Sequence, residues 1–200
     1  MGSNRSVVIM RKYVLFIFII SYHIQSQNKM SSELPYYEIP DYPATYTAGS
    51  AVARMLDGLG FRYYWATEGL NEDDLIYKPS VEARTNSETV DHILGLSKVI
   101  VNATLKKGNE GHDDVSEMSF ADKRKQTLEN IKMAADLLRS SEDISQFKLI
   151  FGEREFPFWN NINGPIEDAV WHCGQIVLMR RASGNPYNAK ASVFTGKVRE

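Results

Sequence analysis

The chain has a single cysteine, Cys173, among its 200 residues. One cysteine cannot form an intrachain disulfide, so the fold must be stabilised by a buried apolar core. A hydrophobic fraction of 43% can supply that core, and a charged fraction of 24% is ordinary for a globular protein. The length suits one domain with a leader or a tail, and two full domains would be cramped.

The sequence also has no dense block of basic residues, and its formal net charge is −2. Proteins that bind nucleic acid neutralise its phosphates with clustered lysine and arginine. We therefore expect no nucleic-acid partner. Internal repeats and low-complexity tracts are missing as well.

The apolar run near the N-terminus is too short to cross a bilayer. It covers 12 residues, 13–24, whereas a spanning helix needs about 20. Arg11 and Lys12 precede it and the small polar stretch 25–27 follows, a pattern typical of a secretory signal peptide. We predict a leader over residues 1–26 and a secreted or periplasmic protein. The alternatives are a membrane-anchoring N-terminal helix and a start at Met10.

Without residues 1–26 the chain carries 20 basic and 25 acidic side chains, a formal charge of −5. This charge favours solubility and disfavours anionic membranes as well as nucleic acid. We therefore expect a small-molecule substrate and no membrane partner after removal of the leader. A homodimer is compatible with the sequence, which leaves the oligomeric state open.

Helical periodicity dominates the remaining sequence. Residues 27–43 are an exception, because three prolines there exclude a regular helix and predict an extended arm. Beyond them, apolar residues recur at steps of three and four in four segments, which predicts four helices. The first runs from about Tyr46 to Leu70, and the others begin near residues 85, 119 and 165. Thr85 and Ser119 have the pattern of N-caps.

The segment before the last helix, about residues 140–164, is irregular but rich in aromatic side chains. It is too apolar for a solvated linker, so we predict a structured crossover with a short hairpin around Gly152. Pro165 suits the first turn of the last helix, which should end around Ser183. Four helices with one long crossover predict an all-α four-helix bundle over residues 44–187, followed by a C-terminal tail, 188–200.

A metal site is indicated by two residues near the start of the last helix. Asp168 and His172 are four positions apart, so their side chains leave the same helix face about 6 Å from each other. A carboxylate and an imidazole in this relation can bind one divalent cation. The leading candidate for a third ligand is His92, which shares a helix face with apolar residues and needs a polar partner.

Two segments of the sequence resemble the DinB/YfiT-like superfamily. The segment NGPIEDAVWHCGQI, 163–176, followed by RRASGNP, is similar to that family's last helix. The segment 87–96, with His92 at its centre, is similar to the family's second helix and its single histidine. The resemblance covers roughly residues 45–186 and is most specific around His172.

The resemblance implies a four-helix bundle that holds a divalent metal. Family members usually bind it with three histidines, one from the second helix and a His-x-x-x-His pair from the last. By this resemblance His92 and His172 are ligands, and Asp168 stands where the family has the first histidine of the pair. The implied site has two histidines and one carboxylate, which suits zinc or nickel and also accepts iron or manganese.

Three protein ligands leave an open metal position, which implies an enzyme that acts on a small molecule by thiol transfer or hydrolysis. Export weakens the thiol-transfer version, since small thiol cofactors are mainly cytosolic. Gln175 and Trp171 are candidate neighbours of the ligands, whereas Cys173 has the pattern of a small buried residue.

Other interpretations remain open. Asp168 can simply complement the helix dipole, and His92 can be a buried histidine with an ordinary hydrogen-bond partner. The protein would then be a non-catalytic bundle, with or without a structural metal. It could also be an extracytoplasmic binding module that uses the aromatic crossover, 147–159.

Overall fold

Helices account for most of the structure, a computed structural model that describes residues 34–111 and 114–200. The predicted leader, 1–26, lies outside the described residues. The all-α class is confirmed at this level. None of the described helices is both long and apolar enough to cross a membrane. The long helices are α2 (Ala48–Thr67), α4 (Asn86–Thr104), α5 (Phe120–Arg139) and α7 (Glu167–Ala182).

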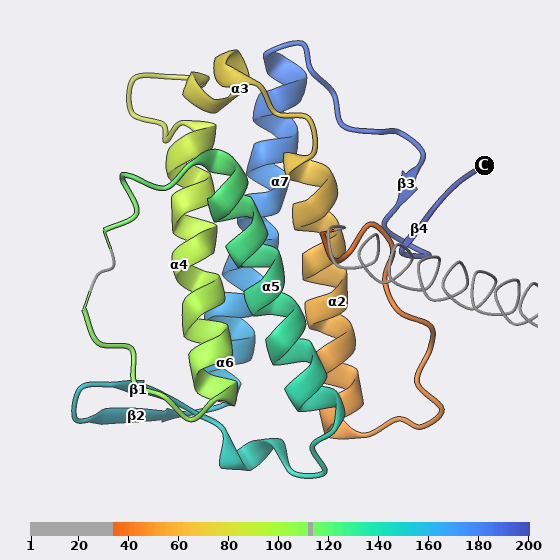
Figure 1. Cartoon of the computed structure of the whole chain (residues 1–200), viewed down its shortest axis with the longest axis vertical. Coiled ribbons are helices and arrows are strands. Elements are labelled where there is room, and N and C mark those ends of the chain that lie inside the picture. Colours follow the sequence, from red (N-terminus) through yellow and green to blue (C-terminus); the bar gives the residue numbers. More distant parts are fainter. Residues whose placement is uncertain (1–33, 112–113) are drawn as a thin grey trace, which may run out of the picture. The chain divides into compact units, whose positions relative to one another are not determined.

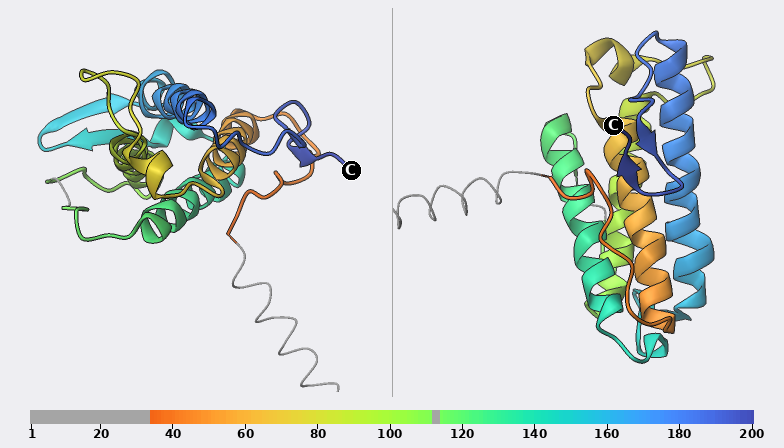
Figure 2. Two further views of the ribbon diagram at one scale, coloured as in Figure 1. Left: turned by 90° about the horizontal axis from the view of Figure 1, so that it is seen from above. Right: turned by 90° about the vertical axis from the view of Figure 1, so that its right-hand side faces the viewer.

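The four long helices run side by side within the unit Pro35–Glu200 (Figures 1 and 2). Each one packs against two of the others: α2 and α4 both contact α5 and α7. Every helix contributes a fully buried aliphatic side chain to the space between them: Leu56, Ile93, Leu128 and Ile176. Burying one such side chain stabilises the fold by about 1.5–3 kcal/mol. The core therefore lies along the shared axis of the helices.

The predicted N-caps begin the helices where the sequence placed them. At α4, the Glu88 amide donates to Thr85 Oγ1 over 3.1 Å, and the Thr85 amide donates to Glu88 Oε2 over 2.7 Å. At α5, the Asp122 amide donates to Ser119 Oγ over 3.1 Å. These bonds satisfy amides that have no partner inside the helix. Helix α2 begins two residues later than predicted, because Thr47 is its N-cap.

The crossover between α5 and α7 contains the predicted hairpin. Strands β1 (Lys148–Phe151) and β2 (Arg154–Pro157) are antiparallel, with Ile150 opposite Glu155. Gly152 has a positive φ of 59° in the turn, a conformation that glycine adopts without strain. The rest of the crossover contains η1 (Ile144–Gln146), α6 (Trp159–Asn161) and η2 (Ile162–Ile166).

Two segments have more structure than the sequence predicted. A short helix, α3 (Glu72–Ile76), follows the Asn71 N-cap in a stretch for which the sequence predicted no helix or strand. The predicted C-terminal tail contains an antiparallel hairpin, β3 (Ala191–Ser192) with β4 (Lys197–Val198). Neither segment has the long apolar repeat from which a helix or strand is predicted. Capping and turn contacts form each segment instead.

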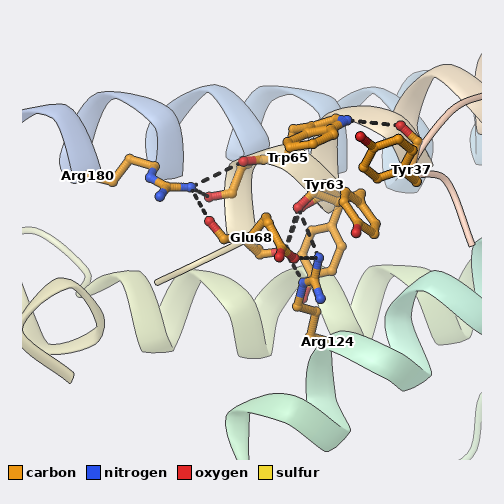
Figure 3. Close-up of polar contacts among 9 residues, drawn as sticks. Tyr37, Tyr63, Trp65, Glu68, Arg124 and Arg180 are labelled. Atoms are coloured by element: carbon orange, nitrogen blue, oxygen red, sulfur yellow. Dashed lines mark hydrogen bonds and ion pairs between the residues drawn. The ribbon is translucent and has the colours of Figure 1, made fainter. Parts of the chain in front are cut away.

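Two buried arginines fasten other helices to the C-terminal end of α2 (Figure 3). Arg180 of α7 donates from Nη1 to the carbonyl oxygens of Trp65, Ala66 and Glu68, over 3.2, 2.9 and 2.9 Å. Arg124 of α5 donates from Nε to Thr67 Oγ1 over 2.9 Å. The last carbonyls of a helix lack partners within it, so Arg180 supplies donors where they are needed.

Candidate metal centre

The helical backbone that carries Asp168 and His172 starts earlier than predicted. It begins at Trp159 in α6, and η2 connects α6 directly to α7. We predicted Pro165 in the first turn of the last helix, but it lies inside η2, which has π geometry. Proline has no N–H and its ring crowds the carbonyl four residues back. A single π turn, which widens the helix locally, is a common way to accommodate such an interruption.

The structure brings the three predicted ligands together. His92 of α4 has its Nε2 atom 3.2 Å from Asp168 Oδ2, and His172 has its Nε2 atom 3.3 Å from Asp168 Oδ1. One ligand atom from each residue lies within 4.8 Å of the other two. The imidazole rings are 4.6 Å apart between centroids and meet edge to face at 87°. The carboxylate therefore lies between two imidazole edges, each facing a different oxygen.

This donor set could hold a metal ion. Zinc binds histidine nitrogen and carboxylate oxygen at about 2.0–2.2 Å, so neighbouring ligands of a tetrahedral site lie roughly 3.3–3.6 Å apart. The two separations that involve Asp168 are close to this value. Two imidazoles and one carboxylate suit zinc, nickel, iron and manganese, so the residues leave the metal type undetermined.

Gln175 fixes the orientation of the His172 ring. The Nδ1 atom of His172 lies 2.8 Å from Gln175 Oε1, one turn further along α7. When Nδ1–H donates this bond, the lone pair of Nε2 points at Asp168. Outer partners of this kind set the tautomer of histidine ligands and raise their basicity.

The site is open to solvent on one side. The side chains of His92 and Asp168 are 34% and 38% exposed, whereas His172 is only 12% exposed. A hollow of about 740 Å³ adjoins His92 along α4 and reaches Phe151 at the end of β1. Gly95, one turn from His92, faces it with no atom within 4 Å of where a Cβ would stand. We did not predict this hollow from the sequence. The signal that could have indicated it is a glycine one turn from a candidate ligand.

Other residues near the centre have different roles. Trp171, a candidate neighbour of the ligands, is 70% exposed on the outside of α7 and lines neither the hollow nor the core. Trp171 is adjacent to His172, and adjacent helix positions are rotated by about 100° from each other. Its side chain therefore points away from that of His172. Asp91 is not a competing ligand, since Lys123 Nζ binds it at 2.7 Å. Cys173 is buried, and burial raises the pKa of its thiol to about 12.

Comparison of the chain with family models, curated proteins and solved structures finds no match to any of them.

Proposed function

We propose that the protein is an exported four-helix bundle, similar to the DinB-like superfamily, whose centre binds a divalent metal and acts on a small molecule. The observation that carries this proposal is the convergence of His92, Asp168 and His172, from two helices, around a shared volume. The pairwise packing of four long helices and the long connection before α7 support the bundle assignment.

The metal would be held by Nε2 of both histidines and by one oxygen of Asp168. We favour zinc or nickel over iron or manganese, because two of the three donors are imidazoles. Gln175 keeps the Nε2 lone pair of His172 aimed inward. A divalent cation in this place would supply Lewis acidity and lower the pKa of a water or thiol that reaches it.

Thiol transfer and hydrolysis are the reactions that this arrangement favours. The hollow beside His92 gives a small substrate access from the side of α4. The exposed fraction of Asp168, 38%, supports an open position over a closed structural site. In this proposal Asp168 supplies the negative carboxylate, and the hollow beside His92 admits the substrate and orients it.

A non-catalytic binding module is the second candidate function. Its support is Trp159, which is 73% exposed at the end of the crossover. Phe147 and Phe158 of the same segment are buried at 6% and 4% exposure, so only part of the crossover's aromatic side chains could contact a partner. We therefore rank this candidate below the metal-dependent enzyme.

The decisive experiment measures zinc and nickel binding by calorimetry on chelator-treated protein. Wild type should bind one metal ion per chain, and His172→Ala should bind much more weakly. Cys173→Ala is the matched control, because its side chain is adjacent in sequence but buried on another face. Equal binding by wild type and His172→Ala would defeat the site assignment.

Activity is tested on the same samples, with transfer of a small thiol to an aryl halide and with hydrolysis of a nitrophenyl ester. Rates should rise when zinc or nickel is restored to the chelated protein. Full activity without metal would contradict the metal-dependent mechanism. N-terminal sequencing of protein secreted by its host would test the predicted leader, 1–26, and so the extracytoplasmic location.

A further inference from the structure

A second cavity lies on the opposite side of α7 from the metal ligands. It occupies about 210 Å³ between α2, α7 and the C-terminal segment that follows α7. None of the three candidate metal ligands lines it. Cys173, which does, is rotated by about 100° from His172 around the helix. The cavity is therefore a separate site, independent of the function proposed above.

The walls of this cavity are apolar. Phe61 and Trp65 come from α2, Val170 and Val177 from α7, and Val193 from the C-terminal segment. The Trp65 indole N–H already donates to the Tyr37 carbonyl oxygen over 3.1 Å (Figure 3), so the ring offers only carbon to the cavity. An occupant must therefore have an apolar body.

The C-terminal segment that lines one side of the cavity is firmly attached. The Ile39 amide donates to the Gly196 carbonyl over 3.0 Å, and the Val198 amide donates to Glu38 Oε1 over 3.0 Å. Lys197 Nζ also binds the Glu38 carboxylate at 3.1 Å. Figure 2 shows this segment beside α2 and α7. On this side the cavity is therefore lined by hydrogen-bonded structure instead of a loosely placed end.

One charged group, Arg62, faces this apolar space. Its Nη1 atom donates to the Gly58 carbonyl oxygen over 3.0 Å, one turn back along α2. Among the residues that the structure describes, no carboxylate forms an ion pair with it. A guanidinium has five N–H donors and matches a carboxylate with two parallel hydrogen bonds. The remaining donors of Arg62 are therefore suited to an anionic group on the occupant.

We propose that this cavity binds a small monocarboxylic acid with an apolar body, whose carboxylate pairs with Arg62. An engineered apolar cavity of about 150 Å³ takes up benzene, so about 210 Å³ accommodates roughly eight to ten non-hydrogen atoms. Straight-chain acids of about eight carbons have this size. The apolar chain packs along α2 and α7, while the carboxylate lies at the guanidinium near the cavity mouth.

Calorimetric titration of the full chain with octanoate tests the proposal, and 1-octanol is the uncharged probe of equal length. Wild type should bind one octanoate per chain, and octanol about tenfold more weakly or worse, because a charged hydrogen-bonded pair is lost. Arg62→Met should reduce octanoate affinity by about tenfold or more and leave octanol unchanged. Arg84→Met, which removes an exposed arginine before α4, is the matched control and should change neither.

Filling the cavity gives the second arm of the experiment. Gly174 lines the cavity, and a Cβ there would meet no atom within 4 Å, so Gly174→Leu should fold and obstruct both probes. Gly95→Leu, at an equally open helical glycine on α4, should leave both affinities unchanged. Circular dichroism checks folding, and Val177→Phe fills the same space if Gly174→Leu unfolds. No saturable octanoate binding, or binding unaffected by Arg62→Met or by the filling variant, would overturn the proposal.

Discussion

Asp168 and His92 are 76 positions apart in the sequence, yet Oδ2 of one lies 3.2 Å from Nε2 of the other. This contact joins α4 to the first turn of α7 at the point where the two helices pack. Here a carboxylate, and not a third imidazole, lies between the two histidines. The centre therefore carries one more negative charge than a site of three neutral histidines would. The substitution of Asp168 is therefore the most informative test of the site's charge.

Asp168→Asn should lower the affinity for zinc by about tenfold or more. Removing a residue that only hydrogen-bonds to a metal ligand already costs about tenfold, and the loss of a ligand should cost at least as much. The amide keeps the size of the side chain but offers one neutral oxygen instead of a negative carboxylate. Calorimetry on chelator-treated protein measures the effect. Glu167→Gln, the same charge change one residue earlier on the exposed face, should leave the affinity unchanged. An unchanged affinity in Asp168→Asn would remove this carboxylate from the site.

Gln175→Leu should also weaken zinc binding, by about 10- to 100-fold, although Gln175 is not a ligand. Loss of the 2.8 Å hydrogen bond to Nδ1 frees the His172 ring to rotate and to change tautomer. Gln126→Leu on α5 is the matched control. Comparable affinity in wild type and Gln175→Leu would show that packing alone orients His172.

Gly95→Leu should separate substrate access from metal binding. A leucine at this position projects into the hollow beside His92 and narrows it. We expect the metal stoichiometry of wild type together with a loss of turnover in the thiol-transfer or ester assay. Gly174→Leu, on the other side of α7, should retain turnover. Full activity in Gly95→Leu would mean that substrate reaches the metal by another route.

Local signals in the sequence predicted the local structure well. Thr85 and Ser119 cap helices because their side-chain oxygens accept hydrogen bonds from amides three residues later. Such a contact depends only on residues that are close in the sequence. The i,i+4 pair of Asp168 and His172 is predictable for the same reason. His92 could be included because its helix face is otherwise apolar, which demands a partner for the ring.

Features that depend on distant packing could not be predicted in this way. The π turn accommodates Pro165 only because helical structure continues from Trp159 into α7, and this continuation packs against α2 and α4, which lie far away in sequence. The hairpin at 191–198 forms against residues 38 and 39, which lie far away in sequence. The cavity at Arg62 exists only once α2, α7 and this hairpin are assembled.

Arg180→Met should lower the free energy of unfolding by about 3 kcal/mol, because several buried carbonyl oxygens of α2 lose their donors together. The methionine keeps most of the apolar stem, so the change reports the hydrogen bonds and not the packing. Urea denaturation provides the measurement. Arg181→Met removes the next, exposed arginine and should cost under about 1 kcal/mol. Equal stability of the two variants would contradict the capping role of Arg180.

Asp74 should make stability depend on pH at the junction of α3 and α7. Burial alone would raise the pKa of this carboxyl, but hydrogen bonds from Ser183, Asn185 and the Asn71 amide outweigh burial and lower it. A carboxyl with a lowered pKa in the folded protein binds its proton more weakly there than in the unfolded chain. Its contribution to stability is therefore complete above the unfolded pKa, about 3.9, and is lost as the pH falls through the folded value.

Asp74→Asn should consequently lower the free energy of unfolding by about 1–2 kcal/mol at pH 7, and by less at pH 3. Urea denaturation of wild type and variant at both pH values measures the two differences. Asp73→Asn alters the exposed neighbour and should show a small change at either pH. A difference between wild type and Asp74→Asn that stays constant from pH 7 to pH 3 would show that the charge of Asp74 does not fasten α3 to the end of α7.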